Sequence, residues 1–175
     1  MTYIVVDVEA DGPIPPSFSM VCFGAVIVDE KLDKTFYGQT RPISDYFITD
    51  ALAISGITRE QHNKFGEPFT VMSLFSEWIK ANTNGKATFI SDNPAFDWQW
   101  INYYFHTYTD NGNPFGFSAR RIGDLYCGMK MDAGKNSEWK KRLRKTKHTH
   151  NPVDDAKGNA EAILAMRDMG LKIHL

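Results

Sequence analysis

The run at residues 3–9 constrains the fold of this chain most strongly, because it is a short apolar segment that ends in two carboxylates. Its β-branched residues and the Asp-Gly-Pro turn at 11–13 predict a buried β-strand. Side chains alternate across a strand, so Asp7 and Glu9 lie on the same face. Two carboxylates there repel each other and resist desolvation, and a divalent cation between them removes both penalties. The alternative is that the strand ends at Asp7 and both groups are solvated.

The composition is that of a folded protein with a substantial core. The chain has 175 residues, 42% of them hydrophobic, and a formal net charge of −1, which suits a single domain over residues 1–175. Cys22 and Cys127 form no disulfide framework or metal motif, so a reducing, cytoplasmic location is expected. The sequence shows neither a signal-peptide pattern nor an apolar run of the roughly 20 residues that cross a membrane, so no membrane partner is expected.

Hydrophobic patterning divides the chain into an N-terminal strand meander and a later alternation of strands and helices. Strands are expected at 20–28, 34–40 and 86–91, short helical pieces at 51–54 and 59–62, longer helices at 69–81, 94–106 and 152–170, and a strand or helix start at 122–129. This pattern predicts a mixed sheet covered by helices. A phosphate-loop or dinucleotide-binding fold is disfavoured, since neither GxxxxGK[ST] nor GxGxxG follows any strand.

Two of the expected helices begin in the same way. Residues 93–97 read Asn-Pro-Ala-Phe-Asp and residues 151–155 read Asn-Pro-Val-Asp-Asp. An Asn cap, a Pro at the first helical position and an acid in the first turn are ordinary helix chemistry. For Asp97, however, the positions three, four, seven and eight further on are all apolar or aromatic. Asp97 is therefore expected on the core side, where its charge needs a partner such as a metal ion.

Helical spacing also separates the two acids of the last helix. Asp155 shares its face with Ala162 and Ile163, whereas Asp154 shares its face with charged residues. We therefore expect Asp155 to point inward and Asp154 to face solvent as a favourable charge at the helix start. His150 precedes the helix cap, where a lone histidine is more often a surface or hydrogen-bonded residue than a catalyst.

Taken together, these segments resemble the three motifs of the DEDDh-type 3′–5′ exonucleases. Asp7-Val8-Glu9 resembles the family's Asp-x-Glu motif at the end of the first strand, residues 93–97 resemble its Asn-x-x-Phe-Asp motif, and residues 150–155 resemble its His followed by Asp five positions later. The order and spacing of the three segments match those of the family's motifs, and the resemblance covers residues 1 to about 170. The resemblance implies an α/β fold of the RNase H-like type, with a mixed five- to six-stranded sheet flanked by helices on both faces.

The resemblance also implies a two-metal mechanism. The metal-binding set is then Asp7, Glu9, Asp97 and Asp155, and the catalytic set adds His150 to these four. Asp7 bridges two Mg²⁺ ions, for which Mn²⁺ can substitute, and Asp97 helps directly or through water. His150 takes the proton from the attacking water, a task suited to a group that titrates near neutrality. His148 is a nearby rival, but His150 has the motif's spacing to Asp155.

Substrate contacts are also implied by the resemblance. Residues 54–58 look like the family segment that approaches the terminal nucleotide, although Ser55 stands where many members carry His. Phe96 is expected to contact a base. A basic stretch like residues 140–147 is usually a solvated face, but beside this site we interpret it as a phosphate-backbone surface whose binding depends on salt. The substrate-binding set is Ala10, Ser55, Phe96, Arg144 and Lys147.

The expected function is hydrolysis of phosphodiester bonds from the 3′ end of single-stranded nucleic acid, releasing nucleoside 5′-monophosphates. RNA is the expected substrate because the chain resembles the family's small stand-alone exoribonucleases, and a DNA-specific enzyme is the alternative. A homodimer is expected from the family alone. Two hypotheses from other classes compete. A nucleic-acid-binding module without catalysis is disfavoured by the complete acidic set, and a glycosidase using Asp7 and Glu9 explains neither Asp97 nor the histidine.

Overall fold

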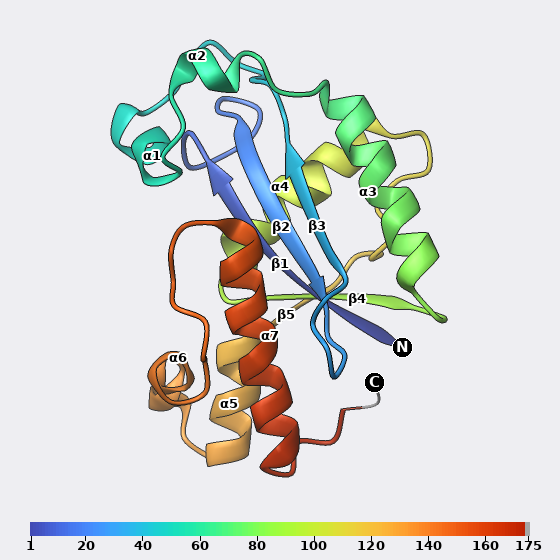
Figure 1. The fold of residues 1–175 in the computed structure, drawn as a ribbon, viewed down its shortest axis with the longest axis vertical. Coiled ribbons are helices and arrows are strands. Elements are labelled where there is room, and N and C mark those ends of the chain that lie inside the picture. The colour runs from blue at the N-terminus through green and yellow to red at the C-terminus, as the bar shows by residue number, and fades with distance from the viewer. Residues whose placement is uncertain (174–175) are drawn as a thin grey trace.

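The computed structural model describes residues 1–173 and contains, in that range, a five-stranded sheet in the order β3-β2-β1-β4-β5 with helices on both faces (Figure 1). The strands are β1 (Thr2–Ala10), β2 (Met20–Ile27), β3 (Thr35–Gln39), β4 (Ala87–Ser91) and β5 (Ala119–Arg121). The first three strands form an antiparallel meander, and β4 and β5 add in parallel next to β1. The predicted mixed sheet is confirmed, with five strands.

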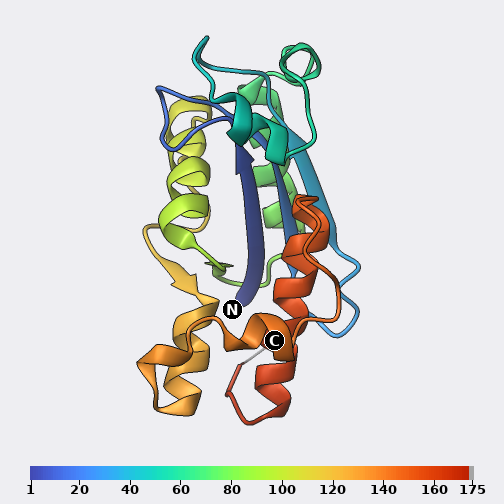
Figure 2. The same cartoon turned by 90° about the vertical axis from the view of Figure 1, so that its left-hand side faces the viewer.

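Helices cover the sheet from both sides. They are α1 (Thr49–Ile54), α2 (Arg59–His62), α3 (Pro68–Asn82), α4 (Pro94–Tyr108), α5 (Ile122–Lys130), α6 (Glu138–Arg142) and α7 (Pro152–Asp168), with a 3-10 turn η1 at Ala133–Lys135. In Figure 2, β1 stands between the layer that contains α4 and the layer that contains α7. No helix in the described part of the chain combines the length and apolar character needed to cross a bilayer.

The alternation of side chains along β1 explains why the core has two halves. Ile4, Val6 and Val8 pack with α3 and α4, whereas Tyr3 and Val5 pack with α5 and α7. Positions 7 and 9 continue the second series, because side chains two apart share a face. The carboxylates of the first strand therefore face the layer formed by α7.

The predicted elements agree with the structure except in three places. The strand β5 is not predicted from the sequence. Residues 122–129, predicted as a strand or helix start, form the helix α5, which follows the short strand β5 directly. Residues 130–150, for which only a polar and basic character is predicted, contain η1 and α6. Trp139 explains the order of this basic segment, because its fully buried side chain belongs to the core beneath α7.

Candidate metal centre and active site

Three carboxylates meet at the end of β1. One oxygen from each of Asp7, Glu9 and Asp155 lies within 4.8 Å of the other two. Asp7 and Glu9 come from the sheet, and Asp155 comes from the first turn of α7, which crosses the same face. Residues from opposite ends of the chain thus form one acidic cluster, which we call the inner triad.

Asp155 lies in the first turn of α7 and is buried, as predicted from the helical spacing. The Asn151 side chain caps the helix by accepting hydrogen bonds from the backbone N–H groups of Val153 and Asp154. Asp155 is fully buried and Asp154 is exposed. The Asp155 carboxylate also accepts backbone hydrogen bonds from Thr149 (3.1 Å) and His150 (2.9 Å). These bonds fold the incoming loop around the carboxylate and hold it at the centre of the site.

Gly24 lets α7 approach the sheet closely enough to complete the inner triad. It lies opposite Asp7 in the antiparallel β1–β2 pair. A Cβ atom built at Gly24 would come within 2.3 Å of the backbone carbonyl of Pro152, the first residue of α7. Because this contact is with backbone, no side-chain rotation can relieve it. Sequence analysis did not single out Gly24, since the apolar run around it reads as an ordinary strand.

The substitution Gly24→Ala is expected to push α7 away from β2 and to destabilise the fold. Forcing a methyl group into a filled contact costs about 1–3 kcal/mol, which corresponds to a melting-temperature loss of roughly 2–12 °C in a protein of this size. Thermal unfolding followed by circular dichroism measures this effect. Gly128→Ala is the matched control, because a Cβ atom at Gly128 meets nothing within 4 Å. Equal melting temperatures for the two variants would contradict the role given to Gly24.

Asp97 reaches the same strand end from the opposite layer. Pairing of β1 with β4 extends only from Thr2 to Val5, and beyond it the Asp97 carboxylate accepts a hydrogen bond from the Val8 N–H at 3.1 Å. Asp97 is 4% exposed, as the apolar helix face predicts. Asn93 occupies the predicted N-cap position of α4, but its side chain makes no hydrogen bond to the helix.

The four acids place several negative charges close together in a partly buried site. Burial is the main cause that raises the pKa of Asp7 well above its ordinary value, and the nearby charges of Asp97, Asp155 and Glu9 raise it further. Burial likewise raises the pKa of Glu9, and it raises the pKa of Asp97 to about 7. Hard oxygen donors with unfavourable mutual repulsion fit a hard divalent cation, which would relieve both the desolvation and the repulsion.

Two histidines flank the inner triad. The Nδ1 atom of His148 lies 2.8 Å from Asp155 Oδ2, and the Nδ1 atom of His150 lies 3.4 Å from Glu9 Oε1. Their ring centroids are 4.3 Å apart. His150 has a backbone φ of 60°, a left-handed conformation that few non-glycine residues adopt. Both members of the predicted His150/His148 alternative therefore lie at the site, each against a different carboxylate.

Arg144 and Lys147, both predicted to bind substrate, occupy different environments. The Arg144 side chain is 9% exposed and pairs with Asp155 Oδ1 at 3.0 Å. It lies against Gly158, where a Cβ atom would come within 2.6 Å of the guanidinium. Arg144 thus balances the charge of the inner triad, whereas Lys147 is exposed. Lys147 lines a cavity of about 350 Å³ together with other residues of the basic stretch and Asp92.

An apolar cavity of about 340 Å³ adjoins Glu9. It is lined by Glu9, Ala10, Gly12, Pro13, Ile48, Ala51, Ile54 and Phe96. Ala10 and Phe96 are therefore close to the acidic cluster, as predicted. Ser55 lies outside this lining, because its hydroxyl donates to the Leu52 carbonyl at 2.7 Å at the end of α1.

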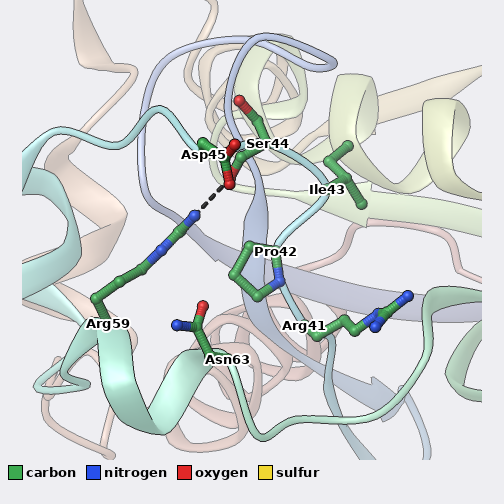
Figure 3. Close-up of a pocket in the computed structure, with 7 residues that line it drawn as sticks. All are labelled: Arg41, Pro42, Ile43, Ser44, Asp45, Arg59 and Asn63. Atoms are coloured by element: carbon green, nitrogen blue, oxygen red, sulfur yellow. Dashed lines mark hydrogen bonds between the residues drawn. The ribbon is translucent and has the colours of Figure 1, made fainter.

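A buried ion pair that was not predicted from the sequence lies next to a further, polar pocket, whose lining includes Arg41, Ser44 and Arg59. Arg59 donates to the fully buried Asp11 at 2.8 Å. It also donates to the Ser44 carbonyl, which lines the same pocket (Figure 3). His62 lies 3.7 Å from the same carboxylate, but burial lowers the pKa of His62 to about 4, so its ring is neutral near pH 7. Arg59 is thus the cation that compensates Asp11. The strand alternation does not signal this pair, because the register shifts between Glu9 and Ala10 and Arg59 lies 48 positions after Asp11.

Comparisons with known proteins agree on one class. The family model described as "3′-5′ exoribonuclease Rv2179c-like domain" matches residues 2–166. The Escherichia coli protein named 3′-5′ DNA exonuclease Cap18 is 36% identical over 166 residues, which cover 91% of this chain and 88% of that protein.

Solved structures show the fold. The nuclease domain of 3′hExo, a DEDDh family member bound to rAMP, has a TM-score of 0.80 at 18% identity, with 99% of this chain and 94% of that chain covered. E. coli Exonuclease I in complex with a dT13 oligonucleotide has a TM-score of 0.66 at 16% identity, with 96% and 40% covered. The predicted RNase H-like arrangement of a mixed sheet with helices on both faces is confirmed by these similarities.

Proposed function

Because the chain belongs to the family of Rv2179c-like 3′–5′ exoribonuclease domains, we propose that its inner triad and Asp97 bind two Mg²⁺ ions and hydrolyse RNA from the 3′ end. It is a 3′–5′ exonuclease of the DEDDh class, a class that uses divalent metal ions. The identity of the ions, the roles of the individual residues and the choice of RNA are our proposals. Mn²⁺ is expected to substitute for Mg²⁺, because both accept carboxylate oxygens.

The observation that carries this proposal is the convergence of Asp7, Glu9 and Asp155 to within 4.8 Å. When bound, the ions would lower the pKa of the attacking water and neutralise the charge that develops on the phosphate and the leaving 3′ oxygen. The protein's part is to hold four carboxylates rigidly. β1 fixes Asp7 and Glu9, the cap of α7 fixes Asp155, and the Val8 N–H fixes Asp97.

His150 is proposed as the general base. Its Nδ1 atom faces Glu9 at 3.4 Å, so Nε2 is the atom that would accept the proton from water. The side chain is 46% exposed, which allows the protonated ring to release its proton to solvent. An imidazole suits this task because its ordinary pKa lies near neutrality.

The 3′-terminal nucleoside is proposed to enter the apolar cavity beside Glu9. Phe96 offers an aromatic surface there, and Ala10 lets the substrate approach the strand end. Lys147 and the neighbouring basic residues are proposed to contact the phosphates further along the strand, which would make binding salt-dependent. Ser55 is proposed to contact the substrate only through its backbone, because its hydroxyl already donates a hydrogen bond to the Leu52 carbonyl. We also propose that residues 1–175 form one exonuclease domain and that the protein is a homodimer, which light scattering tests.

Digestion of matched 5′-labelled RNA and DNA strands with Mg²⁺ tests the substrate proposal. A ladder shortening from the 3′ end is expected for both, with faster loss of RNA. The same RNA with a 3′-phosphate serves as a control for attack from the 3′ terminus. Equal or faster loss of DNA would contradict the RNA preference.

A DNA exonuclease is the second candidate, and a specific observation favours it. The relative with 36% identity is named a DNA exonuclease, whereas the matching family model is described as an exoribonuclease domain. The carboxylate cluster serves either polymer, because it acts on the phosphodiester that both share.

A further inference from the structure

A second cluster of metal-binding groups lies on the outer side of Asp155. One ligand atom from each of His148, His150 and Asp155 lies within 4.8 Å of the other two. The histidines are exposed, and Asp155 is buried. We call this cluster the outer triad. It shares Asp155 with the inner triad, so the two clusters stand side by side along one carboxylate.

We propose that the outer triad is a separate binding site for Zn²⁺ or a similar transition-metal ion. Its donor set is two imidazole nitrogens and one carboxylate oxygen, which suits Zn²⁺ and Co²⁺, whereas the all-oxygen inner triad suits Mg²⁺. Two histidines and one acid with an open fourth position are a common ligand set for zinc in proteins.

The geometry needs only small adjustments to accept such an ion. Ligand atoms around tetrahedral zinc stand about 3.3 Å apart, because each bond is about 2.0–2.1 Å long. The Nδ1 atom of His148 is already 2.8 Å from Asp155 Oδ2, and the two rings are 4.3 Å apart between centroids. The histidine side chains are 54% and 46% exposed, so rotation of either ring displaces no core residue.

The two oxygens of Asp155 have different surroundings. Oδ1 accepts from Arg144 and from the Thr149 N–H, whereas Oδ2 faces His148 and accepts from the His150 N–H. An ion in the outer triad would bind on the Oδ2 side and replace the contact with His148.

Occupation of the outer triad would inhibit hydrolysis, a consequence that rests on the proposed function. The ion would engage the nitrogen lone pair of His150 and draw on Asp155, both of which the reaction uses. Zn²⁺ is therefore expected to inhibit without displacing Mg²⁺ from Glu9. The site itself depends only on the three side chains and can be detected without catalysis.

Titration with Co²⁺, followed by its visible absorption, and with Zn²⁺, followed by calorimetry, tests the site directly. In His148→Gln and in His150→Gln the affinity for both ions is expected to fall at least tenfold. Asp7→Asn is the matched control, because Asp7 belongs only to the inner triad, whereas Glu9 contacts His150. The zinc affinity of Asp7→Asn is expected to stay within about twofold of the original. Thermal melting verifies that each variant is folded.

Unchanged zinc affinity in His148→Gln, or an equal loss in Asp7→Asn, would overturn the proposal and place the ion in the inner triad. In nuclease assays with saturating Mg²⁺, the Zn²⁺ concentration for half-inhibition should rise at least tenfold in His148→Gln, with each protein compared with its own zinc-free rate. Because Co²⁺ binding is read from absorption, a protein without nuclease activity would contradict the proposed function and leave the metal site tested on its own.

Discussion

The substitution Asp7→Asn is expected to lower the exonuclease rate at saturating Mg²⁺ by at least about 1,000-fold. Asp7 lies in the inner triad and is surrounded by Glu9, Asp97 and Asp155. A carboxamide keeps the shape of the side chain but removes the charge that binds the cations. Metal ions supply several kcal/mol of transition-state stabilisation, and a loss of about 4 kcal/mol corresponds to the stated factor. Single-turnover digestion of a labelled strand measures it.

The same substitution is expected to stabilise the metal-free protein. The pKa of Asp7 is raised from 3.8 in the folded protein, so the folded state binds a proton more tightly than the unfolded chain does. Stability is therefore lost as the pH rises through the interval between the ordinary and the raised pKa. In EDTA the melting temperature of Asp7→Asn should exceed that of the original protein, by an amount that grows as the pH rises above 3.8 toward the raised pKa. Added Mg²⁺ should stabilise the original protein more than the variant.

Asp154→Asn is the matched control, because this neighbouring acid is exposed and outside the inner triad. It is expected to change neither the rate nor the stability by a large factor. An Asp7→Asn protein that cleaves at the original rate would show that Asp7 does not bind a catalytic ion. An unchanged melting temperature in EDTA would show that the carboxylates are not under electrostatic strain.

Arg59→Met is expected to destabilise the fold by about 3–5 kcal/mol, because it leaves a buried carboxylate without its cation. Asp11 is fully buried, and the Arg59 side chain is 19% exposed at 2.8 Å from it. His62 does not compensate, since its pKa of about 4 leaves the ring neutral near pH 7. The melting temperature should fall by roughly 6–20 °C, and urea unfolding gives the free energy directly.

Arg41→Met is the matched control for Arg59→Met in the same pocket (Figure 3). Arg41 pairs with Glu67, but both side chains are more than half exposed, and such pairs contribute about 0–1 kcal/mol. The double variant Asp11→Asn, Arg59→Met should recover part of the lost stability, because it removes the uncompensated charge. Equal losses for Arg41→Met and Arg59→Met would mean that burial of Asp11 does not set the cost.

The positions of the carboxylates were predictable because each follows from a local period. Alternation along a strand puts Asp7 and Glu9 on one face, and the 3.6-residue helical period separates the buried Asp155 from the exposed Asp154. The apolar face of α4 likewise predicts the burial of Asp97. These arguments need only residues within a few positions of each acid, so tertiary packing does not change their outcome.

Contacts between distant segments were not predictable in this way. Arg144 is predicted from the sequence to contact substrate phosphate as part of a basic stretch. In the structure the buried Trp139 anchors that stretch, and Arg144 pairs with Asp155. The partner of Asp11 is Arg59 at the start of α2, and the sequence does not predict the path of the chain between these two residues. Gly24 matters only because α7 returns over β2 from the other end of the chain. No local sequence pattern predicts these contacts, because each one forms only when distant segments pack together in the folded protein.

The distribution of the inner triad along the chain has a consequence for protein synthesis. A ribosome translates Asp7 and Glu9 well before Asp155. At about 5–20 residues per second, a ribosome would need several seconds to half a minute between the two. Throughout that interval the nascent chain lacks a complete set of carboxylates. The nascent chain is therefore expected to be unable to hydrolyse the nucleic acid around the ribosome until Asp155 has been translated.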